Sequence, residues 1–432
     1  MNRLASEPSP YLRGAAHQPV HWRAFGKDAF EEARAADKPV LLDVGAVWCH
    51  WCHVMDGESY EDRETARVIN ERFVAVKVDR DERPDVDVRY QKAVQALTGQ
   101  GGWPLTAFLL PDGRCFYGGT YFPPDARHGR PAFRDVLEAV ARFYRDEKTN
   151  ALDQAGRLAR AIAPAPVGAR PGVADARVLA DGERAVRDAF DPVHAGFGGA
   201  PKFPHTGGVL FALRRSRAVP DPGAAALRAV ALETLRGMAR GGIHDRVGGG
   251  FHRYATDARW TLPHFEKMLY DNAELLRAYV QGFQATGEAS LRAVAEGILA
   301  FEHEVLWRPR GGWAASQDAD VSMKDDGSYF TWTKGELEAA VGPDLARLAT
   351  LAWGVGEAEG EVHLTPGRHV LFQAADDDAL AAGLKMDAAE IGARLDEARR
   401  RLKGARDLRK APFVDPTVYV GWNAMMASAA LE

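Results

Sequence analysis

The chain is 432 residues long, which exceeds the usual size of one hydrophobic core and predicts two domains. Hydrophobic residues make up 46% and charged residues 27%, as in globular proteins, and the formal net charge of −5 disfavours a nucleic-acid partner. No apolar run is long enough to predict a membrane span, and the N-terminal segment lacks the apolar core of a secretory signal. We therefore expect a cytoplasmic protein with neither a nucleic-acid nor a membrane partner.

A buried strand that leads into a Cys-x-x-Cys pair is predicted near the N-terminus. The stretch "KPVLLDVGAVW", residues 38–48, is apolar and partly β-branched, which is typical of a buried strand in a parallel or mixed sheet. Cys49 and Cys52 follow it directly, and the next segment, "HVMDGESYEDRETARVINERF", is helix-like. The cysteines therefore fall at a strand-to-helix turn, where the helix N-terminus favours the thiolate of Cys49.

Three chemistries are compatible with the sequence Cys49-His50-Trp51-Cys52-His53: a redox dithiol, a metal site and covalent haem attachment. A structural zinc site commonly takes a second cysteine or histidine pair at a distance, and no second cysteine pair follows. Haem attachment usually takes place outside the cytoplasm, whereas no export signal is evident here. The placement of the pair favours the dithiol, in which Cys49 attacks a disulfide and Cys52 resolves the mixed disulfide.

Residues near the pair have predicted roles in the same chemistry. Asp43 would point from the strand toward the second sulfur, where a buried carboxylate has a raised pKa and can relay a proton; the alternative is a solvated carboxylate at a strand end. Farther on, "GQGGWPLTAFLLPDG" predicts a strand over residues 106–110, and a cis bond at its proline would place backbone beside the dithiol. The predicted catalytic residues are Cys49, Cys52 and Asp43, and the predicted substrate-binding residues are Trp48, His50, Trp51, His53, Trp103 and Pro104.

These segments resemble thioredoxin, with its buried aspartate, its W-C-x-x-C turn and its cis-proline loop. A closer resemblance, to the thioredoxin-domain family related to spermatogenesis-associated protein 20, rests on "SPYLRGAAHQPVHW", "CHWCHVMDGESYED", "VKVDRDERPDVD", "FYGGTYFPP", "GGAPKFPH", "GGIHDRVGGGFHRYATDARW" and "LPHFEKMLYDNAELLRAY". It extends over nearly the whole chain. The resemblance implies an α/β thioredoxin-like domain followed by an all-α (α/α) toroid of the six-hairpin glycosidase kind.

A change of composition separates the two predicted domains. The Ala/Pro/Gly-rich stretch "AIAPAPVGARPGVADA" predicts a linker, so we expect a thioredoxin-like domain over residues 1–165, a linker over 166–177 and a toroid over 178–432. Apolar residues at helical spacing predict a helical-hairpin array, with one helix that starts at Phe265. A closed ring of twelve helices needs roughly 300 residues, so we expect an incomplete toroid, either a fragment or one that another chain completes.

Loops of the helical region concentrate histidines, aromatic residues and carboxylates, as sugar-binding cavities do. The candidates for such a cavity are His205, His252, Arg253, Tyr254, Trp260, His264, Glu266, Asp271, Asp318 and Asp320. A hydrolase would use a carboxylate pair such as Glu266 with Asp318, whereas an epimerase would use histidines such as His252 and His264. The alternative is that these side chains cap helices, bond loops and fill the toroid centre.

Three hypotheses about function follow. The favoured one is a thiol–disulfide oxidoreductase that acts on disulfide-bearing or thiol proteins. The second is a carbohydrate-active enzyme, with a small carbohydrate in the toroid and a regulatory thioredoxin-like domain, and the third is a non-catalytic scaffold. No metal and no cofactor is expected, because "DADVSMKDDG" lacks the glycine and glutamate that a calcium-binding EF-hand loop requires. Cys115, the remaining cysteine, is expected to be a small buried side chain.

Overall fold

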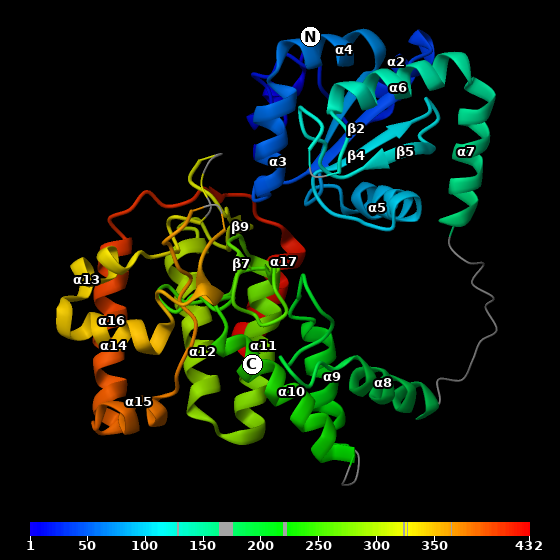
Figure 1. Cartoon of the computed structure of the whole chain (residues 1–432). Helices are drawn as coiled ribbons and strands as arrows, with labels where there is room; N and C mark the ends of the chain where they lie inside the picture. The colour runs from blue at the N-terminus through cyan, green and yellow to red at the C-terminus, as the bar shows by residue number, and fades with distance from the viewer. Residues whose placement is uncertain (128, 164–175, 219–222, 323–324, 326, 364) are drawn as a thin grey trace. The chain divides into compact units, whose positions relative to one another are not determined.

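The computed structural model describes residues 1–127, 129–163, 176–218, 223–322, 325, 327–363 and 365–432 (Figure 1). The chain divides into two compact units, Met1–Pro171 and Gly172–Glu432. Most of the predicted linker, residues 166–175, lies outside the described residues, and the first helix of the second unit already begins at Ala176. Within the described part of the chain, every helix is too short or too polar to cross a bilayer.

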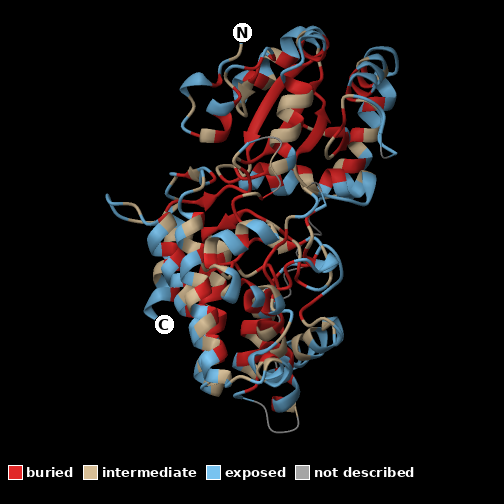
Figure 2. Cartoon of the chain, turned by 60° about the vertical axis from the view of Figure 1, so that its left-hand side comes forward, coloured by how far each residue is buried: buried red, intermediate tan, exposed pale blue. Residues whose placement is uncertain are grey.

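The first unit is built on a mixed five-stranded sheet in the order β1-β3-β2-β4-β5. Its strands are β1 (Arg23–Ala24), β2 (Val40–Gly45), β3 (Val74–Asp79), β4 (Leu105–Leu109) and β5 (Cys115–Gly119). Strands β1, β3 and β2 run parallel, whereas β4 is antiparallel to both β2 and β5. Strands β2, β3 and β4 are buried throughout, as Figure 2 shows in red, which explains their apolar runs, whereas the short edge strand β1 is half-buried.

Helices cover both faces of this sheet. They are α1 (Pro10–Gly14), α2 (Lys27–Ala36), α3 (His50–Met55), α4 (Arg63–Arg72), α5 (Pro84–Thr98), α6 (Phe133–Asp146) and α7 (Lys148–Ala161). Val40, Leu42 and Val44 share a core with residues of α2, α5 and α7. Because side chains alternate along a strand, Leu41 and Asp43 face the opposite side of the sheet, the side of the Cys49–Cys52 turn.

The segment predicted as one helix after the cysteines forms three consecutive elements. Helix α3 ends at Met55, residues Asp56–Tyr60 form a π-helical turn, and α4 begins after Asp62. The Asp62 carboxylate accepts a hydrogen bond from the Thr65 N–H at 2.7 Å, which caps α4 and starts a new helix there.

The second unit is an array of paired helices with short strands between them. Its helices are α8 (Ala176–Ala189), α9 (Thr206–Arg215), α10 (Gly223–Arg240), α11 (Leu269–Thr286), α12 (Ala289–Phe301), α13 (Lys334–Val341), α14 (Pro343–Trp353), α15 (Asp377–Leu384), α16 (Ala388–Arg406) and α17 (Val420–Leu431). Helices α9 to α12 and α17 share one hydrophobic core, and α13 to α16 share a second. The predicted order of the two fold classes is confirmed: an α/β unit with a mixed sheet is followed by a mainly helical unit of paired helices.

The helix that we expected to begin at Phe265 begins at Leu269 instead. Lys267–Met268 form β8, which pairs with β9 (Ser316–Gln317), and β9 pairs with β10 (Val414–Asp415). A hairpin of β6 (Tyr254–Ala255) and β7 (Pro263–His264) precedes it. Pairing with a strand far along the chain therefore overrides the helical periodicity of these residues.

Candidate functional site

The two cysteines lie after strand β2, at the start of α3. Cys49 is the N-cap residue of that helix, and its Sγ accepts a hydrogen bond from the Cys52 N–H at 3.2 Å. The two sulfurs form a disulfide, with Cα atoms 5.2 Å apart. Cys49 is 6% exposed and Cys52 1%, so Cys49 is the more accessible member of the pair. This is the order that attack by Cys49 and resolution by Cys52 requires.

Asp43 is fully buried and is held by three donors. The Lys77 Nζ donates to Asp43 Oδ2 at 2.8 Å, and the hydroxyls of Tyr11 and Tyr60 donate to Oδ2 and Oδ1 at 3.1 and 3.2 Å. Lys77 also donates to Asp56 Oδ1 at 2.8 Å. The carboxylate is therefore not at a solvated strand end, which was the alternative interpretation of the sequence.

Burial and charge act in opposite directions on this cluster. Burial raises the pKa of Asp43, and the nearby Lys77 ammonium only partly offsets that rise. Burial alone would lower the pKa of Lys77, but the Asp43 and Asp56 carboxylates outweigh it, so that the pKa of Lys77 is raised. Burial and the Asp43 charge raise the pKa of both tyrosines, Tyr11 and Tyr60, well above the usual value. Both hydroxyls therefore stay protonated and remain donors.

Two tryptophans flank the dithiol turn and are fixed by carboxylates. The Trp48 Nε1–H donates to Asp81 Oδ2 at 2.7 Å, and the Trp103 Nε1–H donates to Asp87 Oδ1 at 2.9 Å. Their rings meet edge to face with centroids 5.8 Å apart. The guanidinium of Arg80 lies 4.8 Å from the Trp103 ring centre and pairs with both Asp81 and Asp87.

The remaining predicted contacts of the first unit lie around the same turn. The bond between Trp103 and Pro104 is cis and immediately precedes β4, the antiparallel neighbour of β2. Trp51 is 41% exposed, and its ring lies 5.5 Å from that of His50. His53 follows one residue after Cys52 in the last turn of α3 and is half-buried. An exposed indole next to the sulfurs offers an apolar contact to a substrate.

Cys115 lies apart from this turn, on β5. Burial raises the pKa of its thiol to about 12, and its Sγ donates to the Tyr117 carbonyl oxygen at 3.3 Å. A thiol with that pKa is protonated near neutral pH and is a poor nucleophile.

In the second unit, some of the cavity candidates lie together. Tyr254 and His264 are directly opposite in the β6–β7 hairpin, their rings stack at 4.9 Å, and Phe203 stacks on Tyr254 at 4.7 Å. Phe203, His205 and Asp271 line a cavity of about 280 Å³ at the start of α9. Asp271 Oδ2 also lies 3.9 Å from Arg253 Nε.

Two other candidates are packed into the core. His252 is buried between Phe265 and Phe330, and burial lowers its pKa to about 3. Its Nδ1 lies 2.8 Å from the Phe265 carbonyl oxygen. Trp260 is completely buried and donates to the Ala195 carbonyl oxygen at 3.2 Å. For these two residues the structural interpretation fits better than a role in ligand binding.

Three carboxylates among the candidates are buried near one another. Glu266 follows β7, and its Oε2 lies 3.8 Å from His264 Nδ1. Burial, with the negative charge of Asp320 beside it, raises the pKa of Asp318 well above the usual value, and Glu266 adds to that rise. A raised pKa favours the neutral carboxylic acid, which is the form that a general acid requires.

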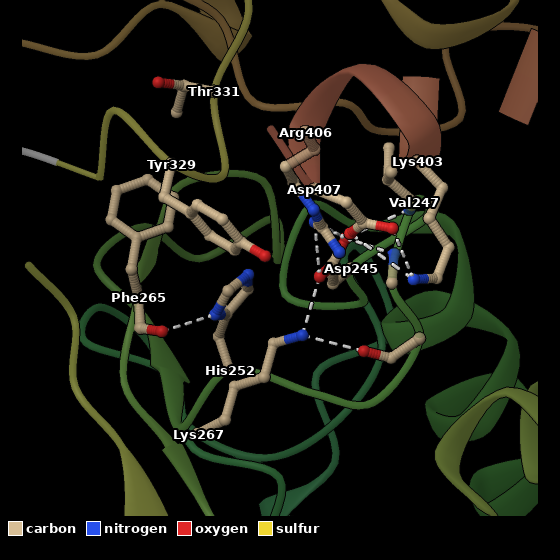
Figure 3. A network of polar contacts seen from close by, with 12 residues as sticks. Asp245, Val247, His252, Phe265, Lys267, Tyr329, Thr331, Lys403, Arg406 and Asp407 are labelled. Carbon is tan, nitrogen blue, oxygen red and sulfur yellow. Dashed lines mark hydrogen bonds and ion pairs between the residues drawn. The ribbon is translucent and has the colours of Figure 1, made fainter. Parts of the chain in front are cut away.

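A buried ionic network near His252 has no counterpart in the sequence predictions (Figure 3). Asp245 accepts from Lys267 Nζ at 2.6 Å and from Arg406 Nη1 at 2.8 and 2.9 Å. The N–H groups of Val247 and Gly248 donate to Asp245 Oδ1 at 3.0 Å. The network joins the end of α16 to the loop before β6, which indicates a role in holding the helical unit together.

Comparison with known proteins agrees with this organisation. Residues 1–163 match the family described as "Thioredox_DsbH: Protein of unknown function, DUF255". Spermatogenesis-associated protein 20 of Homo sapiens is 36% identical over 456 aligned residues, which include 99% of this chain, and the chain spans 58% of that relative's length.

Two solved structures also overlap with parts of the chain. A structure described as "DsbH Oxidoreductase" covers 31% of this chain and 85% of its own, at 19% identity and a TM-score of 0.20. Cellobiose 2-epimerase from Spirochaeta thermophila covers 36% of this chain and 42% of its own, at 21% identity and a TM-score of 0.28. The chain is therefore similar along its length to spermatogenesis-associated protein 20, and its residues 1–163 match the Thioredox_DsbH family.

Proposed function

We propose that this protein is a thiol–disulfide oxidoreductase that uses Cys49 and Cys52 as a redox couple. The observation that carries the proposal is the Cys49–Cys52 disulfide at the N-terminus of α3, with Cys49 more exposed than Cys52 and with the Asp43–Lys77 pair buried on the same side of the sheet. A disulfide-bearing protein is the proposed substrate, and the cytoplasm, where such reductants work, is the proposed location.

The proposed reaction has two exchange steps. The Cys49 thiolate attacks one sulfur of a substrate disulfide, forms a mixed disulfide and releases the other substrate sulfur as a thiolate. The Cys52 thiolate then attacks Cys49 Sγ, so that the Cys49–Cys52 bond forms and the second substrate sulfur leaves. Two electrons pass from the dithiol to the substrate, and the Cys52 proton must be taken up in the second step. Trp48, Trp51, Trp103 and the Pro104 loop are the proposed contacts to the substrate.

Trapping of the mixed disulfide tests this proposal. A Cys52→Ser variant should accumulate a disulfide between Cys49 and a protein substrate, whereas a Cys49→Ser/Cys52→Ser variant should trap nothing and reduce no insulin. The matched control is Cys115→Ser, because that buried thiol is not part of the exchange, and its activity should stay within about twofold of the wild type. If Cys52→Ser traps no protein and the wild type reduces no disulfide, the proposal fails.

A second candidate function, carbohydrate binding in the helical unit, is favoured by the stack of Phe203, Tyr254 and His264. Aromatic faces of this kind suit the apolar faces of sugar rings, and Asp271 and His205 supply polar groups at the neighbouring cavity. Calorimetric titration with mono- and disaccharides tests it: Tyr254→Ala should abolish binding, and Trp307→Ala, at an exposed indole elsewhere, should not. Loss of function in His264→Ala but not in the double cysteine variant would favour this candidate over the redox proposal.

A further inference from the structure

Two groups lie beside Gly45: the sulfur of the resolving residue Cys52, and the hydroxyl of Tyr11, which donates to the buried Asp43 carboxylate. Gly45 ends β2, two residues after Asp43 and on the same face of the sheet. A methyl group added to Gly45 would collide with the Tyr11 hydroxyl oxygen and would lie 2.8 Å from Cys52 Sγ. The Tyr11 hydroxyl and the Cys52 sulfur therefore border one small space, which is left open because residue 45 has no side chain.

The hydroxyl of Tyr11 has the hydrogen-bond direction that a relay needs. It donates its proton to Asp43 Oδ2 at 3.1 Å, so its oxygen lone pairs remain available to the side on which Cys52 lies. Tyr11 is 5% exposed, and the Lys77 ammonium lies 4.5 Å from the centre of its ring. The ring is thus held against the ion pair that Lys77 forms with Asp43 and Asp56.

We propose that Tyr11 connects Cys52 to Asp43 and carries the proton of the resolving thiol. In the second exchange step the Cys52 thiol gives its proton to the Tyr11 oxygen, while the Tyr11 proton passes to Asp43, which becomes a neutral carboxylic acid. The electron pair left on Cys52 Sγ forms the bond to Cys49 Sγ, and the bond from Cys49 to the substrate sulfur breaks. This inference rests on the proposed redox function and assigns the route of its proton.

The surrounding charges suit such a transfer. The titratable groups that face the route are Asp43 on β2, Lys77 on β3, Asp56 after α3 and Tyr60 at the end of the π-helical turn. Burial raises the pKa of the Asp43 carboxyl, so that the carboxyl can hold the proton for the duration of the step. Lys77 pairs with both Asp43 and Asp56 and offsets part of their negative charge.

A single-turnover reaction with a chromogenic aromatic disulfide separates the two exchange steps. Reduced protein should release one coloured thiolate when Cys49 attacks and a second when Cys52 resolves, so the two phases report the two cysteines independently. In Tyr11→Phe the first phase should stay within about twofold, while the second should slow roughly 10-fold or more, as expected for loss of a general base. The deficit should shrink at high pH, where hydroxide removes the thiol proton directly.

The matched comparison is Tyr60→Phe. Each variant removes one hydroxyl donor from Asp43, so an effect through the carboxylate's pKa alone would slow both to the same degree. Greater slowing in Tyr11→Phe supports the relay, and equal slowing, or a second phase unchanged in Tyr11→Phe, overturns it. If the wild type shows no second phase at all, the redox function itself fails instead.

A measurement on the wild type keeps the test valid should Tyr11→Phe fold poorly. The relay moves two protons in one step. A plot of the second-phase rate against the fraction of deuterium oxide in the solvent should therefore be curved rather than straight. A second-phase rate that is the same in water and in deuterium oxide would contradict the relay.

Discussion

Asp43 and Lys77 stand opposite each other on the parallel strands β2 and β3, and their ion pair is sealed from solvent beneath the dithiol turn. The register pairs the two residues directly, and Lys77 Nζ lies 2.8 Å from Asp43 Oδ2. Both side chains are almost wholly buried. A buried ion pair costs much desolvation free energy, which its hydrogen bonds to Tyr11, Tyr60 and Asp56 help to offset.

Removal of the lysine should therefore destabilise the first unit strongly. Lys77→Met leaves Asp43 buried without a counter-charge, and we expect a loss of about 3–5 kcal/mol in the free energy of unfolding. Urea unfolding measures this loss. The control is Arg67→Ala, which removes exposed ion pairs with Glu64 and Glu71 and should cost less than about 1 kcal/mol. The account would be contradicted if the two variants were equally stable.

Asp79 should make the stability of the protein depend on pH. Burial raises its pKa to about 7, with Asp81 adding to the rise and the Ser9 hydroxyl, 2.6 Å from Oδ2, opposing it. The folded state therefore holds this proton more tightly than the unfolded state, whose aspartates titrate near pH 4. The free energy of unfolding should fall as pH rises from about 4 to about 7, by up to ~4 kcal/mol from this group.

An Asp79→Asn variant isolates that contribution. The amide that replaces the carboxyl group carries no titratable charge, so urea unfolding across the same pH range should show a smaller slope. Asp43 should account for part of the slope that remains. The interpretation is wrong if the slope of the variant matches that of the wild type.

Arg80 should control how substrates bind rather than how the sulfurs react. Its guanidinium lies against the Trp103 ring and pairs with the two carboxylates, Asp81 and Asp87, that bind the indole N–H groups. For Arg80→Ala we expect KM for a protein disulfide to rise roughly 10-fold, a loss of about 1.4 kcal/mol. The rate with a small aromatic disulfide should hardly change.

Arg83 offers the matched control in the same loop, because its exposed pair with Asp85 does not touch the tryptophans. Steady-state kinetics with insulin give KM for the protein disulfide, and kinetics with the small aromatic disulfide give the rate of the exchange itself. A fall in kcat with unchanged KM in Arg80→Ala would show that this residue acts on the chemistry instead.

Asp245 should be a principal stabiliser of the helical unit. Asp245→Ala leaves Lys267 and Arg406 buried without their shared carboxylate, and we expect a loss of about 3–5 kcal/mol. Hydrogen exchange should show α16 as the first helix to lose protection. Asp396→Ala, on the exposed face of α16, is the comparison and should leave exchange unchanged. Equal protection in both variants would mean that the network contributes little.

Local pattern alone predicts much of the dithiol site. The apolar run that contains β2 predicts a strand, and the position of Cys49 just after this run predicts the turn. Tyr11, Lys77 and Tyr60 could not be found in this way, because their contacts with Asp43 join segments 32, 34 and 17 residues away. The spacing of residues along the chain does not show which residue of β2 lies opposite which residue of its parallel neighbour β3.

The helical unit shows the opposite limitation. His252 and Trp260 are predicted as cavity residues because histidine and tryptophan often bind ligands, yet both are buried in the interior of the unit. The same residue types serve buried cores when a backbone carbonyl satisfies their N–H, and only the fold reveals that carbonyl. Tyr254 and His264, by contrast, do stack on each other, because they occupy paired positions of one hairpin.

The reduction potential of the Cys49–Cys52 pair tests the central claim most directly. The protein is equilibrated in glutathione or dithiothreitol buffers of known potential, and free thiols are then alkylated and counted by mass. We predict one two-electron transition of Cys49 and Cys52 between roughly −300 and −120 mV, with Cys115 unchanged throughout. Absence of any transition in that range, or sulfurs that bind a metal ion and never pair, would contradict the account.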